Sequence, residues 1–296
     1  YLRLSDETVQ LHVGPFFHLG AGQRVFSVTQ ARGRHIILEK FSVDAVLETI
    51  EQERVTSMVL VPTMMHRILS HPRLGDFDLS SLRYVSYGAA PMPPALLASF
   101  MKRFSDCEVC QSYGQTECAP VATSLEHADH LSTGLYGNKS KTVGRAVQYV
   151  TIEIVGTQGE VLPPNSVGEI TVRGPNVMLG YWKNAEATAN TIRDGKLHTG
   201  DLGSMDEHGF VTLVDRIKDM VISGGENVYS VEVEHVLTQA QGVLAAAVIG
   251  LPDADLGERV HAIVHQGDEH VLDPQELKEH CRQHLAGYKI PRSMEF

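Results

Sequence analysis

The chain has 296 residues, of which 43% are hydrophobic and 21% are charged, so its composition excludes a disordered protein and allows a sizeable core. Its net charge of −11 lacks the basic footprint of proteins that bind nucleic acids or anionic membranes. The longest apolar runs, such as Val243–Ile249, are too short for a transmembrane segment, and four cysteines favour a reducing cytoplasm over a disulfide framework.

The first 125 or so residues alternate short apolar runs with helical periodicity, which predicts a parallel α/β sheet. The expected strands are Val9–Val13, Ile36–Leu38 (expected to be buried), Ser57–Val61, Arg83–Tyr87 and Glu108–Tyr113. The expected helices are Ser42–Arg54 with Ser42 as N-cap, Pro62–His71 and Pro94–Phe104.

The pattern changes at about Leu131. Strand-like segments separated by Gly, Pro and Asn then predict an antiparallel, barrel-like region; these segments are Val150–Val155, Gly168–Arg173 and Phe210–Val214. After Asp215 the α/β alternation returns, with a helix from Ser230, strands at Ala245–Ile249 and Val260–His265, and a helix over Asp273–Leu285. Asp273 as N-cap, Pro274 at the first helical position and Glu276 give this last helix a strong start.

Both ends of the sequence run into strand patterns. The chain begins without Met shortly before Val9–Val13, and it stops at Met294–Phe296, where another strand pattern begins. We therefore expect an internal piece of a longer protein.

The hexapeptide Ser112–Glu117 carries the most informative chemistry. It follows a strand, so it is expected at the carboxyl edge of a parallel sheet, where open α/β sheets bind ligands. Its tyrosine can stack on a base, its glycine lets backbone approach, its hydroxyl can donate to phosphate, and its carboxylate can hold Mg²⁺. The alternative is a plain turn with an exposed tyrosine.

Three further segments suggest polar ligand contacts. In Leu197–Asp201 a carboxylate follows a tight Thr-Gly turn and can accept hydrogen bonds from both hydroxyls of a ribose, although Thr-Gly-Asp is also a common turn. Asp215–Asp219 is a charged connector at the change of pattern. Ser223–Asn227 is a glycine loop that allows close backbone approach, or else an ordinary β-turn.

In order along the chain, these segments resemble the motif series of the adenylate-forming superfamily, which holds acyl- and aryl-CoA synthetases, adenylation domains of peptide synthetases and beetle luciferases. The Gly-Gly-Glu-Asn loop resembles the acyl-CoA synthetase branch. The matching motifs are Pro15–His18, Ser86–Pro91, Tyr113–Glu117, Gly168–Ile170, Gly180–Trp182, Thr199–Asp201, Asp215–Asp219 and Gly224–Asn227.

The resemblance implies a nucleotide site. Its ATP- or AMP-binding residues are Gly88, Ala89, Ala90, Tyr113, Gly114, Thr116, Asp201 and Arg216. Tyr113 would stack on an adenine held in a slot lined by Gly88–Ala90, and Asp201 would hold the ribose with Arg216 beside it. Thr116 would touch the α-phosphate and Glu117 would bind Mg²⁺.

The resemblance also implies an acyl pocket, a hinge and a path for coenzyme A. His18 would gate the pocket, whose apolar lining is suggested by Phe16, Phe17, Val61, Met64 and Met65. Lys218 would be the hinge, and the coenzyme A tunnel would be bordered by Ser223, Gly224, Gly225 and Glu226. The catalytic set is therefore His18, Thr116, Glu117 and Lys218.

Three departures from the superfamily pattern matter. The phosphate loop that ends in Pro-Lys is missing and belongs upstream of Tyr1. The distal catalytic lysine is also missing, because Lys289 lies in the stretch that precedes it. Ser230 replaces the proline usual after Val-Tyr and is expected to serve as an N-cap.

Two other patterns are assigned to structure. Cys107 and Cys110 form a C-x-x-C pair that runs into a predicted core strand, which favours burial over zinc binding or redox chemistry. His280 and His284 are four residues apart on a helix without an evident third ligand, which favours a solvated face.

The expected fold is α/β: a parallel α/β sheet lobe (about residues 1–125), an antiparallel barrel-like subdomain (about 131–217), and a small, truncated α/β C-terminal lid (218–296) hinged at Lys218. The expected function is a cytoplasmic, AMP-forming acyl-CoA synthetase for a fatty or aryl acid, with ATP, Mg²⁺ and coenzyme A. The alternatives are a ligase that loads a carrier protein, or a non-catalytic or degenerate nucleotide-binding fragment. The piece alone is not expected to be competent, and a homodimer is left open.

Overall fold

The computed structural model describes residues 3–267 and 272–296 and divides them into two compact units. The first unit runs to Glu153 and also contains Thr171–Thr199 and Met205–Thr212. The second unit contains Ile154–Ile170, Gly200–Ser204 and the chain from Leu213. Over the described residues, every helix is too short or too polar to cross a membrane.

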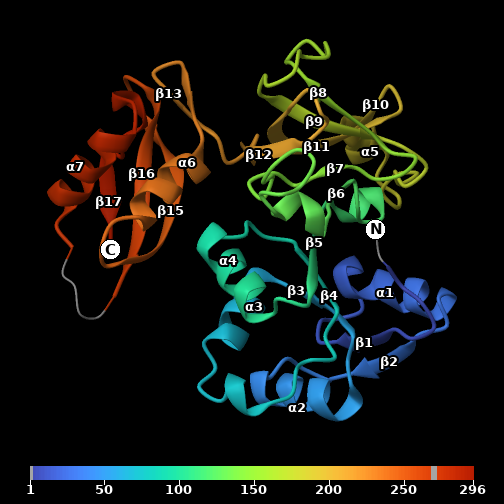
Figure 1. The fold of residues 1–296 in the computed structure, drawn as a ribbon. Coiled ribbons are helices and arrows are strands. Elements are labelled where there is room, and N and C mark those ends of the chain that lie inside the picture. The colour runs from blue at the N-terminus through green and yellow to red at the C-terminus, as the bar shows by residue number, and fades with distance from the viewer. Residues whose placement is uncertain (1–2, 268–271) are drawn as a thin grey trace. The chain divides into compact units, whose positions relative to one another are not determined.

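A seven-stranded sheet in the order β2-β1-β3-β4-β5-β6-β7 organises the first unit, as Figure 1 shows. Its first five strands in this order are parallel, β6 pairs antiparallel with β5, and β7 pairs antiparallel with β6. The strands are β1 (Val9–His12), β2 (Arg34–Ile37), β3 (Ser57–Leu60), β4 (Tyr84–Gly88), β5 (Glu108–Tyr113), β6 (Thr123–Leu125) and β7 (Arg145–Ala146). The helices are α1 (Leu19–Gln30), α2 (Val43–Glu53), α3 (Pro62–Leu69) and α4 (Pro94–Arg103), with 3-10 turns η1 (Leu74–Asp76), η2 (Thr116–Cys118) and η3 (His127–His130).

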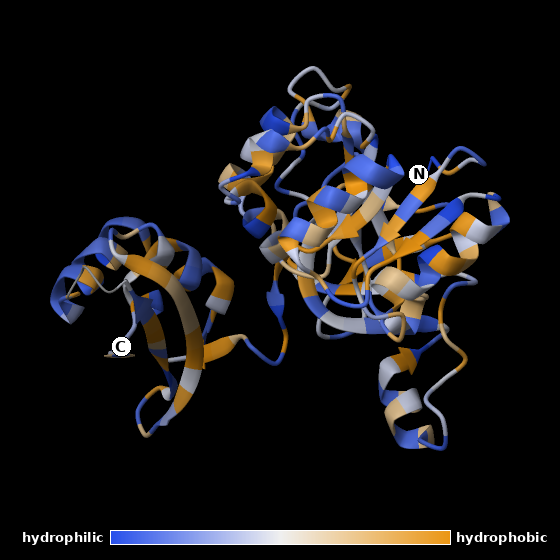
Figure 2. Cartoon of the chain, turned by 90° about the horizontal axis from the view of Figure 1, so that it is seen from below, coloured by the Kyte–Doolittle hydropathy of each residue, from blue (hydrophilic) through white to orange (hydrophobic). Residues whose placement is uncertain are grey.

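The helices of this unit form where their residues favour them. In α2 the apolar residues Val46, Leu47 and Ile50 recur at helical spacing and are buried in the same core as residues of the sheet. Both α3 and α4 begin with a proline, whose fixed φ suits the first turn and whose missing N–H is not needed there. In Figure 2, the helices carry both hydrophilic and hydrophobic residues, as expected of helices with one face towards a core.

Three details differ from the sequence-based expectations. The strand at Ile36–Leu38 is not buried: β2 is an edge strand, and Ile37 is 61% exposed. Helix α1 was not expected, because its two glycines weaken the helical pattern. Ser42 occupies the N-cap of α2 as expected, but in the described chain no N–H of the helix donates a hydrogen bond to its side chain.

A second sheet follows the order β10-β11-β9-β8, with β12 paired to β11. Its strands are β8 (Thr151–Val155), β9 (Gly168–Arg173), β10 (Ile192–Arg193), β11 (Lys196–Met205) and β12 (Val211–Arg216), and helix α5 (Ala185–Thr191) precedes β10. The sheet is the expected barrel-like region. The predicted Thr-Gly turn is wrong, since Thr199–Asp201 lies inside β11, where Gly200 has a φ of +74°.

The third sheet builds the end of the chain in the order β14-β13-β16-β15, with β17 beside β16. Its elements are β13 (Val221–Ser223), β14 (Glu226–Val228), α6 (Ser230–Thr238), β15 (Val243–Asp253), β16 (Gly257–Gln266), α7 (Pro274–His284), η4 (Gly287–Lys289) and β17 (Ser293–Glu295). Helices α6 and α7 share a core with the sheet through Val233, Leu237, Leu277 and Cys281. Asp273 caps α7 as expected, because its side chain accepts the Gln275 N–H.

Candidate functional site

The sheet of the first unit brings two predicted motifs side by side. Strands β4 and β5 are parallel neighbours, and Gly88 pairs with Ser112, so Gly88–Ala90 and Tyr113–Glu117 leave the same carboxyl edge. A Cβ on Gly88 would lie 2.4 Å from the Ser112 carbonyl oxygen, so the pairing requires glycine there. Ala89 turns the chain away from the strand with a φ of +66°. The edge thus presents exposed backbone next to a tyrosine.

The loop after β5 is held tightly. Gly114 has a φ of +153°, and an added Cβ would lie 2.2 Å from the Pro120 carbonyl oxygen. The Tyr113 carbonyl accepts the Ala122 N–H at 2.8 Å, which closes the loop. Thr116 is exposed and Glu117 is half-buried, in the short turn η2. Two of the polar groups predicted for phosphate and metal are therefore accessible on a fixed loop.

Glu117 has a partner that the sequence did not predict. The Tyr181 hydroxyl donates to Glu117 Oε1 at 2.7 Å, and the Glu117 carbonyl accepts the Met178 N–H at 2.8 Å. The hydrogen bond to Glu117 raises the pKa of Tyr181 above its ordinary value. Asn176 fastens the same segment, since its Nδ2 donates to the Cys118 and Val121 carbonyls. Tyr181 belongs to the motif Gly180–Trp182, which matches the superfamily series, so this motif was the sequence feature that could have pointed to a role for Tyr181.

Behind the edge lies a buried pair, Tyr87 and His130. His130 Nδ1 lies 2.8 Å from the Glu126 carbonyl, so that nitrogen carries the proton. His130 Nε2 then accepts from the Tyr87 hydroxyl at 2.8 Å. Burial raises the pKa of Tyr87 and lowers the pKa of His130, so both are neutral at pH 7. This pair supports the end of β4, and no spacing in the sequence indicated it.

Asp201 and Arg216 meet within the second unit. Arg216 Nε lies 3.4 Å from Asp201 Oδ1, and the side chain of Asp201 is mostly buried while that of Arg216 is largely exposed. The Gly200 N–H donates to Glu169 Oε1 at 3.2 Å, and the Gly200 carbonyl accepts the Ile217 N–H at 2.9 Å. The structure therefore places the two predicted ribose residues together.

Asp215, one residue before Arg216, is buried and reaches helix α6. It accepts hydrogen bonds from the Arg216 N–H, the Ser230 N–H and the Ser230 hydroxyl. The expectation that Ser230 is an N-cap is wrong: Tyr229 holds that position, and Ser230 is the first residue of α6. Its side chain donates to Asp215 instead of accepting from the helix.

The predicted hinge and glycine loop lie further along the same unit. Lys218 is exposed in a turn in which the Asp219 and Met220 N–H groups donate to the Arg216 carbonyl. Gly224 and Gly225, with φ of +62° and +83°, form the two-residue turn of the β13–β14 hairpin. Ser223 is buried, whereas Glu226 is exposed. The backbone is thus a β-turn, and its glycines are exposed.

The predicted acyl-pocket residues fall into two environments. His18 occupies the N-cap position of α1 and is exposed, and Phe17, which is 85% exposed, packs its ring against it. Val61 precedes α3, and Met65 in that helix is fully buried in the core. Phe17 and His18 are available to a ligand, whereas Met65 serves packing.

The cysteine and histidine pairs show structural environments. Cys107 and Cys110 are buried, as expected, and burial raises the pKa of Cys107 to about 12. His280 Nε2 lies 2.9 Å from the Val236 carbonyl, so this histidine joins α7 to α6 rather than facing only solvent. Over residues 3–267 and 272–296, no group of three or more His, Cys, Asp or Glu is arranged to hold a metal ion.

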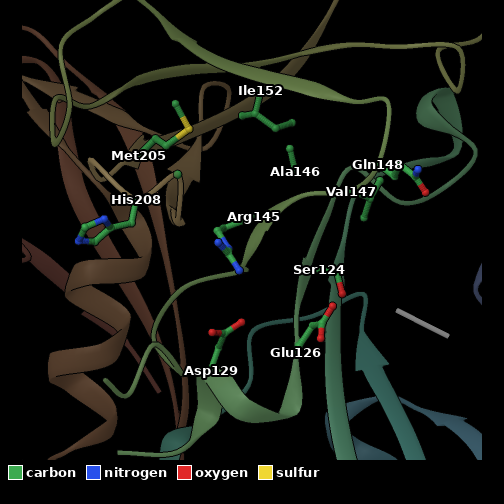
Figure 3. Close-up of a pocket in the computed structure, with 11 residues that line it drawn as sticks. Ser124, Glu126, Asp129, Arg145, Ala146, Val147, Gln148, Ile152, Met205 and His208 are labelled. Atoms are coloured by element: carbon green, nitrogen blue, oxygen red, sulfur yellow. The ribbon is translucent and has the colours of Figure 1, made fainter. Parts of the chain in front are cut away.

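A pocket of about 480 Å³ lies elsewhere in the first unit, as Figure 3 shows. Its charged lining comprises Glu126, Asp129, Arg145 and His208. The Arg145 guanidinium is held over the rings of Tyr136 and Phe210. Within the described chain, the residues predicted for the nucleotide, the metal and the acyl group are not among those lining it.

Comparison with known proteins adds family-level evidence. The family described as "AMP-binding enzyme" matches residues 1–182, and the "AMP-binding enzyme C-terminal domain" matches residues 232–296. A feruloyl-CoA synthase from Amycolatopsis sp is 44% identical over 293 residues, which is 99% of this chain and 58% of that protein.

Two solved structures are similar over nearly the whole chain. An amide bond synthetase from Marinactinospora thermotolerans is 40% identical with a TM-score of 0.86, over 99% of this chain and 57% of that one. ATP-bound MatB from Rhodopseudomonas palustris is 34% identical with a TM-score of 0.89, over 100% of this chain and 57% of that one. The chain thus spans less than two thirds of the length of these relatives.

Proposed function

Because the chain belongs to the AMP-binding enzyme family, as its motif series predicted, we propose that the full-length protein is an AMP-forming ligase that joins a carboxylic acid to coenzyme A. The observation that carries the proposal is the shared edge of β4 and β5, which sets Gly88–Ala90 beside Tyr113–Glu117. The similarity to a feruloyl-CoA synthase supports the same reaction class.

In this proposal the first unit binds the base and the phosphates. The Tyr113 ring stacks on adenine, and Gly88–Ala90 offers backbone groups at its edge, with Ala89 held at positive φ. Gly114 lets the loop pass close to Pro120, so the chain turns directly after Tyr113. The Thr116 hydroxyl, exposed in η2, donates to the α-phosphate.

Glu117 is the proposed Mg²⁺ ligand. Carboxylate oxygens are ligands that Mg²⁺ prefers, and the Tyr181 hydroxyl donates to Oε1 of the Glu117 carboxylate. That hydrogen bond orients the carboxylate and leaves Oε2 for a cation. When bound, the ion would neutralise phosphate charge. The residues present therefore fit the metal that the family uses.

Asp201 and Arg216 are the proposed ribose residues. Each oxygen of the Asp201 carboxylate can accept one of the two ribose hydroxyls, and Arg216 holds the carboxylate from its side at 3.4 Å. Gly200 positions Asp201, because the Gly200 N–H donates to Glu169 and the Gly200 carbonyl accepts the Ile217 N–H.

The proposed chemistry has two steps. A carboxylate oxygen attacks the α-phosphorus of ATP, the bond to the β-phosphate breaks, and pyrophosphate leaves with acyl-AMP formed. The coenzyme A thiolate then attacks the acyl carbon, the bond to AMP breaks, and the thioester is released. Two such different steps fit a hinge at Lys218, which lies exposed in a turn, with Ser223–Glu226 bordering the coenzyme A path.

The acid is proposed to be hydrophobic, either aryl or fatty. Phe17 is exposed beside His18, the N-cap residue of α1, and Val61 precedes α3, so the apolar side chains of Phe17 and Val61 can face an acyl chain. The boundary at 217/218, a homodimer and a cytoplasmic location stay predictions.

Release of pyrophosphate by the full-length protein tests the function. A panel of cinnamic, benzoic and medium-chain fatty acids is assayed with coenzyme A or with a phosphopantetheinylated carrier protein as acceptor. Acid-dependent release of pyrophosphate and AMP, with a thioester of coenzyme A, supports the proposal. Transfer only to the carrier protein supports the alternative ligase, and the absence of pyrophosphate release with every acid contradicts both.

A further inference from the structure

Asp215 is a buried carboxylate that joins two parts of the second unit. It is only 8% exposed, at the end of β12, and it accepts the Ser230 N–H at 2.5 Å and the Ser230 hydroxyl at 3.0 and 3.1 Å. Its own neighbour Arg216 donates a third hydrogen bond from its N–H at 2.7 Å. A buried carboxylate persists only where donors surround it, so these contacts fix the position of Asp215.

The donors from Ser230 depend on the residue type at the start of α6. Ser230 is the first helical residue, whose N–H has no acceptor inside the helix. Serine provides this N–H and a hydroxyl, whereas the proline usual at this point of the motif provides neither. The positive end of α6 also favours a carboxylate. The chain therefore has a link between β12 and α6 that proline would remove.

The same short segment holds the proposed ribose pair. Arg216, whose N–H is bound to Asp215, contacts Asp201 through its guanidinium, and Ile217 donates its N–H to the Gly200 carbonyl. Residues 215–217 thus contact helix α6 on one side and the strand that carries Asp201 on the other.

We propose that Asp215 is a positioning residue which, through Ser230, couples helix α6 to the Arg216–Asp201 pair. The inference rests on the proposed function, since it assigns that pair to the ribose. Nucleotide bound at Asp201 then favours attachment of α6, and attachment of α6 favours nucleotide binding, because such coupling is reciprocal. Asp215 itself touches neither nucleotide nor acid.

Ser230→Pro is the sharpest variant, because it removes both donors and keeps the helix. Proline is well suited to the first helical position, and Tyr229 already has the extended backbone required before proline, with φ −81° and ψ 119°. Ser230→Ala removes only the hydroxyl. Thr238→Ala is the matched control, because Thr238 donates its hydroxyl within the other end of α6.

The experiment measures hydrogen exchange of the first-turn amides of α6 and AMP affinity by calorimetry in the full-length protein. We expect AMP to slow this exchange in the unmodified protein, and we expect Ser230→Pro to abolish the slowing and weaken AMP binding about fivefold or more, with Ser230→Ala between them. Thr238→Ala should behave like the unmodified protein. Because Ser230→Pro leaves the buried Asp215 with only the Arg216 N–H as a donor, its melting temperature should fall by several degrees. Exchange and affinity are therefore compared well below that melting temperature, where circular dichroism shows Ser230→Pro to be folded, which separates uncoupling from unfolding.

Two results overturn the coupling. In the first, Ser230→Pro binds AMP as tightly as the unmodified protein does, and AMP slows amide exchange in α6 equally in both proteins. In the second, the unmodified protein binds AMP, but AMP does not change the exchange rate of the first-turn amides of α6. Failure of the unmodified protein to bind AMP would instead contradict the proposed function, and the coupling with it.

Discussion

Replacing Tyr181 by phenylalanine tests whether Glu117 is held for a metal ion. The change removes one hydroxyl, which donates to Glu117 Oε1 at 2.7 Å, and leaves the ring in place. A hydrogen bond to a charged acceptor contributes roughly 1.5–3 kcal/mol when buried. Because Tyr181 is 37% exposed and water can replace its hydroxyl, we reduce this to about 0.5–1 kcal/mol, or about a two- to fivefold change.

The assay is steady-state kinetics of pyrophosphate release at varied Mg²⁺ with saturating acid. We expect Tyr181→Phe to raise the Mg²⁺ concentration required for half-maximal rate by this two- to fivefold factor. The melting temperature should change little. Tyr149→Phe is the control, since Tyr149 is 78% exposed and the described residues show no hydrogen bond between it and Glu117. An unchanged Mg²⁺ requirement in Tyr181→Phe would refute the assigned role of this hydrogen bond.

The remaining predictions concern the nucleotide, the hinge, the sheet edge and acid stability. Asp201→Ala should lower kcat/KM for ATP roughly a hundredfold, because two charge-assisted hydrogen bonds are lost, and a change below about threefold would speak against the ribose role. Lys218→Pro should spare pyrophosphate exchange and cripple thioester formation from preformed acyl-AMP; parallel loss at an unchanged melting temperature would argue against a hinge. Gly88→Ala should cost about 1–3 kcal/mol of unfolding free energy through the 2.4 Å clash, whereas Gly20→Ala in α1, with open space around it in the described structure, should cost nothing, as chemical denaturation would show. Burial, with the nearby His35 and Arg24, lowers the pKa of His12 from 6.5 to about 4. The contribution of His12 to stability is therefore complete above pH 6.5 and is lost as the pH falls towards 4, and replacing His12 by Gln should flatten this part of the stability–pH curve.

Hydrophobic patterns along the sequence predicted those strands and helices that are determined by their own residues. Strands β5 and β9 have the expected bounds, and α2 has the expected apolar face. The resemblance of the motif series predicted the family, and the adjacency of β4 and β5 explains why Gly88 and Tyr113 belong to one site. These features are short-range or follow from parallel strand order.

Contacts between distant residues were beyond prediction from the sequence. Glu117 and Tyr181 are 64 positions apart, and Asp215 and Ser230 are 15 apart, so each contact depends on how the strands pair. The Thr-Gly-Asp motif predicted a turn because glycine is common in turns. In the structure, Gly200 instead lies inside the ten-residue strand β11, with a positive φ of +74°.

The path of one carboxylate oxygen tests most directly whether the protein forms an acyl-AMP intermediate. The full-length protein is incubated with ATP, coenzyme A and an acid labelled with ¹⁸O in both carboxylate positions, and the AMP formed is analysed by mass spectrometry. Attack of the carboxylate on the α-phosphorus predicts one ¹⁸O atom in each AMP. Unlabelled AMP, or label that appears in inorganic phosphate beside ADP, would contradict an acyl-AMP intermediate and with it the function proposed for this chain.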